Sequence, residues 1–164
     1  MVLDLRNVFV NENKSVSVST EFDFGTLEVY GGHPLKKPVA VNGSVSNRAG
    51  IVTLDLDLEV TYSAPCDRCG TETVKPYCIK VKRTLVNELG NEDNDEMLLL
   101  SDFKLNLDEF VYSEVVLNLP TKHLCKDDCR GICEKCGKNL NNGDCGCSKK
   151  EIDPRLAPLA ELLK

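Results

Sequence analysis

The chain has 164 residues, a formal net charge of −6, and 5% aromatic residues with no tryptophan. A chain this long can bury a sizeable core, and its acidic balance excludes a protein that simply coats nucleic acid. No run approaches the roughly 20 apolar residues of a membrane span, and the opening MVLDLRNVFVNEN lacks a signal peptide's long apolar stretch. We therefore expect a cytoplasmic protein without a membrane partner. In that compartment thiols stay reduced, so dense cysteine favours metal binding over disulfides.

Charge is unevenly spread along the chain. Residues 1–86 balance ten acidic against ten basic groups, residues 87–120 hold nine acids and one lysine, and residues 121–164 hold nine basic and seven acidic groups. A zinc ion with four thiolates carries two net negative charges, so two such sites would make the last segment negative. The tail is therefore not an unambiguous phosphate-binding surface.

Alternating apolar and polar residues predict strands in the first half of the chain. The pattern covers residues 16–24 and 39–46 and is clearest over 52–60, where five apolar side chains would share one face. The turn at 47–50 predicts a hairpin between the last two segments, and a fourth strand is expected from about Tyr77 to Val86. Together these segments predict an antiparallel sheet with one wet face, or a partly open barrel.

The next segment predicts a loop and then a helix. GNEDNDEM, residues 90–97, is acidic and turn-rich, as expected of a mobile loop. Asn106 and Glu109 form a capping-box pattern for a helix from about 107 to 118 that ends before Pro120. The expected fold class is α+β with one or two short helices, a sheet body over 1–120, and a zinc-binding tail over 121–164 packed on that body.

The C-terminal sequence IDPRLAPLAELLK contains four leucines that could pack on the body or dock a partner. These are Leu156, Leu159, Leu162 and Leu163.

Six of the nine cysteines lie between Cys125 and Cys147, with the spacing C-x3-C-x3-C-x2-C-x8-C-x-C. Cys133 and Cys136, followed by Gly137, have the form of a zinc knuckle, in which two thiolates of a tight turn bind one ion. Cys145 and Cys147 add two more sulfurs, and the glycine between them allows the bend that brings these sulfurs together. The four residues predict one structural zinc site.

Cys66 and Cys69, followed by Gly70, form a second knuckle that needs two further ligands. Cys125 and Cys129 are the natural pair, which predicts a second structural zinc that joins the sheet to the tail. The spacing also permits a different partition, with 125/129/133/136 at one ion and 66/69/145/147 at the other. We expect Cys78 to be a half-buried strand residue and His123 to be solvated, although His123 is a possible substitute ligand.

Two other chemistries are compatible with these cysteines. A redox-active C-x2-C usually begins a helix in a thioredoxin-like unit, whereas Cys66 and Cys69 lie between two predicted strands. Four thiolates can also hold a [4Fe–4S] cluster.

The chain resembles the YceD family, the large-ribosomal-RNA-subunit accumulation proteins. The resemblance rests on Pro65, Cys66, Arg68 and Cys69 after a strand, an acidic loop, a short helix, LCKDDCRGICEKCGKNLN at 124–141, a C-x-C pair, and IDPRLAPLAELL at 152–163. It covers most of the chain from about residue 35. Some relatives lack most of the cysteines and keep the fold, which implies that zinc stabilises this branch. The family implies a role in large-subunit ribosome assembly and provides no catalytic residue.

These observations lead to a non-enzymatic ribosome-assembly factor as the first hypothesis, with ribosomal RNA or an assembly intermediate as partner and other assembly proteins as further partners. The alternative is a zinc-stabilised adaptor that binds proteins through its C-terminal leucines. An enzyme is disfavoured because the two histidines, His33 and His123, lie in no nucleophile motif. The candidate RNA contacts are Arg68, Lys75, Lys80, Lys82, Arg83 and Arg130.

Overall fold

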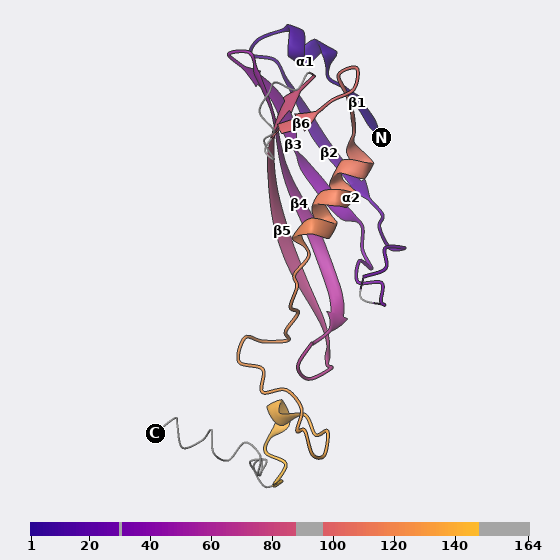
Figure 1. The fold of residues 1–164 in the computed structure, drawn as a ribbon, viewed down its shortest axis with the longest axis vertical. Helices are drawn as coiled ribbons and strands as arrows, with labels where there is room; N and C mark the ends of the chain where they lie inside the picture. Colours follow the sequence, from indigo (N-terminus) through magenta and orange to yellow (C-terminus); the bar gives the residue numbers. More distant parts are fainter. Residues whose placement is uncertain (30, 88–96, 148–164) are drawn as a thin grey trace, which may run out of the picture.

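The computed structural model describes residues 1–29, 31–87 and 97–147. An open five-stranded sheet has the order β2-β3-β4-β5-β6, and a two-stranded sheet pairs β1 with β7 (Figure 1). The strands are β1 Val2–Asp4, β2 Ser15–Phe22, β3 Val39–Arg48, β4 Ile51–Pro65, β5 Glu72–Val86, β6 Met97–Leu99 and β7 Lys104–Asn106. The helices are α1 Arg6–Val10, α2 Leu107–Asn118 and the 3-10 turn η1 Leu140–Asn142. The predicted α+β class is confirmed, with a sheet that is open rather than closed into a barrel.

All strand pairs in these sheets are antiparallel except β5–β6, which is parallel. The predicted hairpin joins β3 to β4 through Ala49 and Gly50, whose φ angles are +52° and +79°. Two successive positive φ values match the turn that suits the right-handed twist of a two-residue hairpin.

The core lies between one face of the sheet and helix α2. The alternating apolar residues of β4 are buried as predicted, and so are the valines of β3 at 39, 41 and 45. Leu107, Val111 and Val115 of α2 are fully buried against them. The opposite face of the sheet carries mainly serine, threonine, aspartate and lysine, because every second residue of each strand points there.

Strands β4 and β5 form a long hairpin that extends beyond the rest of the sheet and ends beside residues 121–147 (Figure 1). Its tip, residues 66–71, carries the first cysteine knuckle. Strand β5 begins at Glu72, five residues before the predicted start. The alternation is not recognisable in this part of the sequence because Val74 and Pro76 are exposed.

The capping box at the start of α2 is not formed. Asn106 has an extended backbone, pairs with Val2 in the β1–β7 ladder, and makes no side-chain bond to the helix. The chain's own N-terminus takes over part of this role, since the Leu107 N–H donates to the Met1 carbonyl at 3.0 Å. Sequence reasoning did not anticipate β1, β7, β6 or α1, because each is only three to five residues long.

Residues 90–96 of the predicted acidic loop and the leucine-rich segment 152–163 lie outside the described residues, whereas Met97 begins β6. Within the described ranges, no helix has both the length and the apolar character needed to cross a membrane.

Candidate metal centres

The structure gathers eight of the cysteines into two sets of four. The first centre consists of Cys66, Cys69, Cys125 and Cys129, and in each set the four sulfurs lie within 4.8 Å of one another. The second centre consists of Cys133, Cys136, Cys145 and Cys147. This is the favoured partition of the sequence analysis, and the alternative pairing of 125/129 with 133/136 is not the one observed.

The sulfur geometry fits a tetrahedral metal ion. In the first centre Cys66 Sγ lies 3.8 Å from Cys129 Sγ, and Cys69 Sγ lies 3.6 Å from Cys125 Sγ. A tetrahedron with metal–sulfur bonds of about 2.3 Å places its sulfurs about 3.8 Å apart. A disulfide would require about 2.05 Å, and all four of these cysteines are free. The donor set therefore suits one four-coordinate ion.

The knuckle of the first centre is held by backbone hydrogen bonds at the tip of the β4–β5 hairpin. The Gly70 N–H donates to the Cys66 carbonyl at 2.8 Å, and the Cys66 N–H donates to the Thr71 carbonyl at 2.9 Å. Gly70 has φ +69°, a conformation that favours glycine. Arg68 Nη1 donates to the Cys129 carbonyl at 2.9 Å and so ties the tip to the tail.

The knuckle of the second centre repeats this arrangement. The Gly137 N–H donates to the Cys133 carbonyl at 2.8 Å, and the Cys133 N–H donates to the Lys138 carbonyl at 2.8 Å. Gly137 and Gly146 both have φ +72°, as their positions in the two cysteine turns predicted. The centres differ in exposure: Cys66 and Cys129 are each 3% exposed, whereas Cys136 and Cys147 are exposed.

The pKa values of the cysteines within each set differ widely. Burial raises the pKa of Cys66, but backbone hydrogen bonds from Cys125, Arg68 and Cys69 outweigh it and lower this pKa to about 6. Burial and neighbouring thiols raise the pKa of Cys125 to about 12. A hydrogen bond with the Thr71 side chain also lowers the pKa of Cys69. The protein therefore stabilises some of the thiolates by itself, whereas four together need a cation among them.

The second centre shows the same division. Backbone hydrogen bonds from Cys136 and Lys135 lower the pKa of Cys133 to about 6. Hydrogen bonds with the Cys136 and Cys145 thiols raise the pKa of Cys147 to about 12.

His123 is not solvated, contrary to the sequence expectation. It is 3% exposed and packs its ring 5.0 Å from that of Tyr62. Its backbone N–H donates to Asp67 Oδ2 at 2.6 Å, and its Nε2 lies 3.3 Å from the Thr73 carbonyl. A carbonyl only accepts, so Nε2 carries the proton in this contact. His123 thus joins the tail to the hairpin and belongs to neither cysteine set.

Cys78 lies outside both sets, as expected, but it is exposed rather than half-buried. Its position on the outer face of β5, opposite Glu59, explains the exposure.

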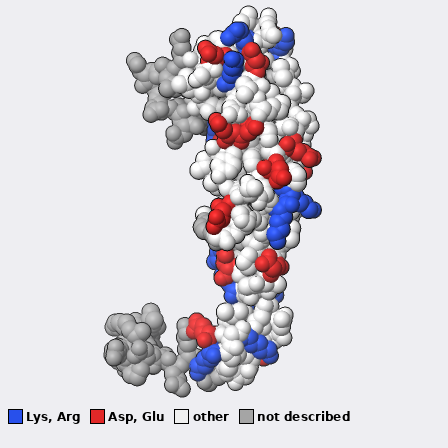
Figure 2. All heavy atoms as spheres, turned by 90° about the vertical axis from the view of Figure 1, so that its right-hand side faces the viewer, with Lys and Arg blue, Asp and Glu red and all other residues white. Residues whose placement is uncertain are grey.

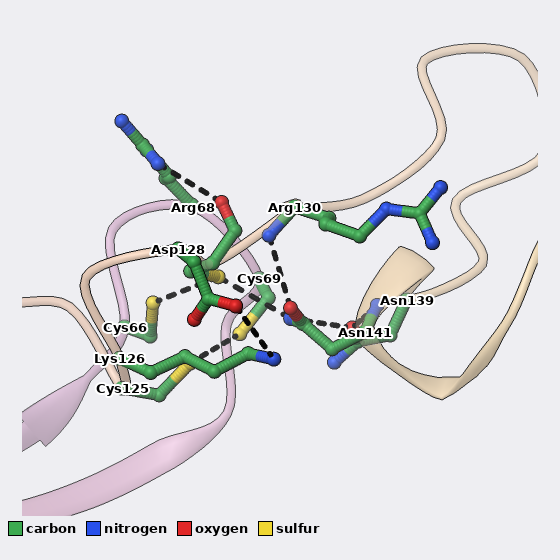
Figure 3. A network of polar contacts seen from close by, with 10 residues as sticks. Cys66, Arg68, Cys69, Cys125, Lys126, Asp128, Arg130, Asn139 and Asn141 are labelled. Carbon is green, nitrogen blue, oxygen red and sulfur yellow. Dashed lines mark hydrogen bonds and ion pairs between the residues drawn. The ribbon is translucent and has the colours of Figure 1, made fainter.

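Two asparagines connect the centres and were missed by the sequence reasoning. Asn141 Nδ2 donates to Cys129 Sγ at 3.2 Å (Figure 3). Asn139 Nδ2 donates to Thr71 Oγ1 at 3.2 Å. Thr71 Oγ1 in turn lies 3.3 Å from Cys69 Sγ. The available signal was the cluster of asparagines between Cys136 and Cys145, since asparagine often bonds its own turn and leaves its amide free to donate.

The candidate RNA contacts do not form one surface. Lys80 and Lys82 are exposed on the outer face of β5, but they lie opposite Asp57 and Asp55 of β4. Arg83 is on the other face, where its Nη2 donates to Glu114 Oε1 of α2 at 2.8 Å.

The remaining three candidates are distributed between the hairpin and the tail. Lys75 is partly buried opposite Tyr62, and Arg68 holds the Cys129 carbonyl. Arg130 Nη2 pairs with Asp144 Oδ1 at 2.6 Å. In Figure 2, basic and acidic side chains are interspersed along the visible face.

Fold and sites together define an α+β protein with two four-cysteine clusters, each suited to one metal ion. Comparison with family models then identifies the group: residues 54–163 match the model of the large ribosomal RNA subunit accumulation protein YceD. The chain belongs to the YceD family, and the match spans both cysteine centres.

The chain is also similar to individual proteins, at identities of 25% to 31%. The chain is 25% identical over 129 residues to the uncharacterised protein YlbN of Bacillus subtilis, covering 77% of this chain and 75% of that protein. It is 31% identical over 133 residues to an uncharacterised protein of Mycobacterium tuberculosis, covering 67% of this chain and 62% of the relative. It is 25% identical over 160 residues to the chloroplastic large ribosomal RNA subunit accumulation protein YCED homolog 1 of Arabidopsis thaliana, covering 79% of this chain but only 50% of the relative. No solved structure matches the chain significantly.

Proposed function

We propose that this protein is a non-enzymatic factor for large-subunit ribosomal RNA accumulation that acts in the cytoplasm with two structural zinc ions. The observation that carries the proposal is the family match over residues 54–163, which includes every cysteine of both centres. Two relatives named for large ribosomal RNA subunit accumulation support the same role.

Zinc is the metal that the donor sets support best. Four thiolates in a tetrahedral arrangement favour zinc or an iron–sulfur cluster. The knuckle turns suit a single ion, and four protein ligands leave no open position for a substrate, so the zinc would have a structural role. At the first centre the ion would join the hairpin ligands Cys66 and Cys69 to the tail ligands Cys125 and Cys129.

RNA contact is proposed through individual exposed cations rather than a uniform basic patch. Residues 121–147 hold five basic and four acidic groups, and two tetrathiolate zinc ions would add four net negative charges. Lys80 and Lys82 on β5 and Lys122 and Lys126 in the tail are exposed and can reach phosphates. Arg83 is less available, because an RNA contact would disrupt its pair with Glu114.

The test is RNA binding by charge-neutralised variants. Glutamate at 80 or 82 would place like charges directly opposite Asp57 or Asp55 and would destabilise the sheet, so Lys80→Gln/Lys82→Gln is the appropriate change. Each lost phosphate contact should reduce the salt-dependence slope of binding by about 0.7–0.9. The matched control is Lys14→Gln/Lys104→Gln, which removes two exposed lysines outside the proposed contacts.

The measurement is the affinity for large-subunit RNA fragments between low and moderate salt, together with RNA accumulation in cells. We expect weaker binding and a shallower slope for the Lys80/Lys82 variant but not for the control. Equal slopes for both variants and wild type would show that β5 does not contact RNA. If no variant and no wild-type protein retains RNA, direct RNA contact is wrong.

A protein-binding adaptor is the second candidate, and one feature of α2 favours it. Tyr112, Val116 and Leu117 of α2 are 43%, 41% and 77% exposed. Apolar docking resists salt, so a partner retained at high salt and lost on Leu117→Ser would support the adaptor. The C-terminal leucines of the original adaptor hypothesis lie outside the described residues.

A further inference from the structure

We propose that Asn141 is a positioning residue that couples the two metal centres, so that each bound metal raises the affinity of the other centre. The inference rests on the proposed metal binding and goes beyond it: two separate knuckles need not influence each other. The coupling would pass through the segment Asn139–Asn141, which lies between the knuckle ligands of the second centre and its last two cysteines.

The direct contact is the hydrogen bond from Asn141 Nδ2 to Cys129 Sγ at 3.2 Å (Figure 3). Two further hydrogen bonds fix the orientation of this amide. The Arg130 N–H donates to Asn141 Oδ1 at 2.9 Å, and Asn141 Nδ2 also donates to Asn139 Oδ1 at 2.9 Å. Because the amide is already held in this orientation, donation to the sulfur costs little additional rotational entropy. Donation to a thiolate stabilises its charge and orients it as a ligand.

A second route runs through the neighbouring asparagine. Asn139 Nδ2 donates to Thr71 Oγ1 at 3.2 Å, and this hydroxyl oxygen lies 3.3 Å from Cys69 Sγ. One short turn of the second centre's loop therefore reaches two of the four sulfurs of the first centre.

The backbone keeps this turn in place. Leu140 N–H donates to the Gly131 carbonyl at 2.9 Å, and the Asn141 N–H donates to Asn139 Oδ1 at 2.9 Å. Gly131 has φ +74°, and a Cβ there would lie 3.1 Å from the Arg68 carbonyl of the hairpin tip. The tail backbone just before the second knuckle thus packs closely against the hairpin tip.

Metal binding at the second centre fixes both ends of the loop that carries Asn139 and Asn141, since Cys136 precedes this loop and Cys145 follows it. Loss of that metal would release the loop at both ends and weaken its hydrogen bonds to the first centre. By linkage, the factor by which the second metal strengthens the first centre equals the factor in the opposite direction.

The experiment is a double-mutant cycle on the full chain. Wild type, Asn141→Ala, Cys133→Ser/Cys145→Ser and the combined variant are titrated with Co²⁺ under reducing conditions, and zinc affinity is measured by chelator competition. The two transitions of wild type are assigned with the Cys133→Ser/Cys145→Ser variant and with Cys66→Ser/Cys125→Ser. Asn142→Ala is the matched control, since Asn142 is the exposed neighbour in the same turn.

We expect disabling the second centre to weaken the first by about 10–100-fold, the range for lost outer partners of metal ligands. Asn141→Ala should reproduce most of this loss in the intact protein and add little when the second centre is already disabled. Loss of the N–H donor should also move the sulfur-to-cobalt charge-transfer band to lower energy in Asn141→Ala but not in Asn142→Ala.

Three outcomes would overturn the proposal. Asn141→Ala could weaken the first centre no more than Asn142→Ala does, or it could weaken this centre equally in both backgrounds, which would make it a local partner without coupling. Absence of a tetrathiolate cobalt spectrum in wild type would reject the metal centres themselves, and so would separate failure of the proposed function from failure of the coupling.

Discussion

Gly43 in β3 lies so close to the neighbouring strand that no side chain fits there. A Cβ at this position of β3 would lie 2.0 Å from the Asp55 carbonyl oxygen and 2.8 Å from Leu56 Cα, both of them backbone atoms of β4. Backbone in the middle of a paired ladder cannot move away cheaply. We expect Gly43→Ala to lower the free energy of unfolding by about 1–3 kcal/mol or more, the usual cost of overpacking, as measured by urea denaturation of the metal-loaded protein.

Gly32→Ala is the control for this change, because the nearest atom to its Cβ would be the Val29 carbonyl oxygen at 3.9 Å. Its unfolding midpoint should stay close to that of wild type. Equal midpoints for Gly43→Ala and Gly32→Ala would show that strands β3 and β4 can separate locally at this point.

The ion pair between Arg83 and Glu114 predicts an asymmetric response to mutation. Glu114 is only 6% exposed, whereas 31% of the Arg83 side chain is exposed. Arg83→Leu would leave a buried carboxylate without its cation, at a cost of about 1–3 kcal/mol. Glu114→Leu should cost less, because the long arginine side chain can extend its head into water.

Denaturant unfolding of the two single variants measures this difference at neutral pH. We expect Arg83→Leu to be the less stable variant. A larger loss for Glu114→Leu would mean that the carboxylate, rather than the guanidinium, has ready access to water.

At the scale of elements, the spacing of apolar residues predicted both kinds of long element: alternation predicted the strands, and recurrence at helical intervals predicted the helix. The five apolar residues of 52–60 face the core, and Leu107, Val111 and Val115 lie on the buried stripe of α2. The inward orientation of Arg83 could also have been deduced from the sequence, because Val81 and Leu85 on either side of it in the alternation are apolar. Both of these residues are buried.

The short elements and local contacts were not predictable in this way. Elements of three residues carry no measurable period, and the partners of Asn106 and His123 lie in distant segments, at Val2 and at the hairpin tip. The cysteine spacing left two partitions open, and the contact of the hairpin tip with residues 125 and 129 decides between them.

The second centre should be separable from the sheet. Its ligands all lie between residues 133 and 147, whereas the sheet has a core of its own formed with α2. We expect Cys136→Ser to release one metal ion per chain while far-ultraviolet circular dichroism and the cooperative unfolding of the sheet persist. Cys78→Ser is the control, since this exposed thiol belongs to neither centre. Loss of all cooperative unfolding in Cys136→Ser would show that the tail and the sheet form one unit.

The whole molecule is elongated, with the α2-covered sheet toward one end and the two cysteine centres toward the other (Figure 1). Among the described residues, the hairpin tip contacts the tail at the sulfurs of the first centre, through the bond from Arg68, and through the hydrogen bonds of His123 and Asn139. We expect a metal ion at the first centre to strengthen this junction between the hairpin tip and the tail.

Metal content is the most direct test of the central claim, which is that two tetrathiolate zinc centres build this end of the molecule. Native mass spectrometry of protein purified under reducing conditions should show two zinc ions per wild-type chain, and one in either Cys66→Ser/Cys125→Ser or Cys133→Ser/Cys145→Ser. A wild-type chain with one zinc or none, or a brown protein that contains iron, would contradict the account.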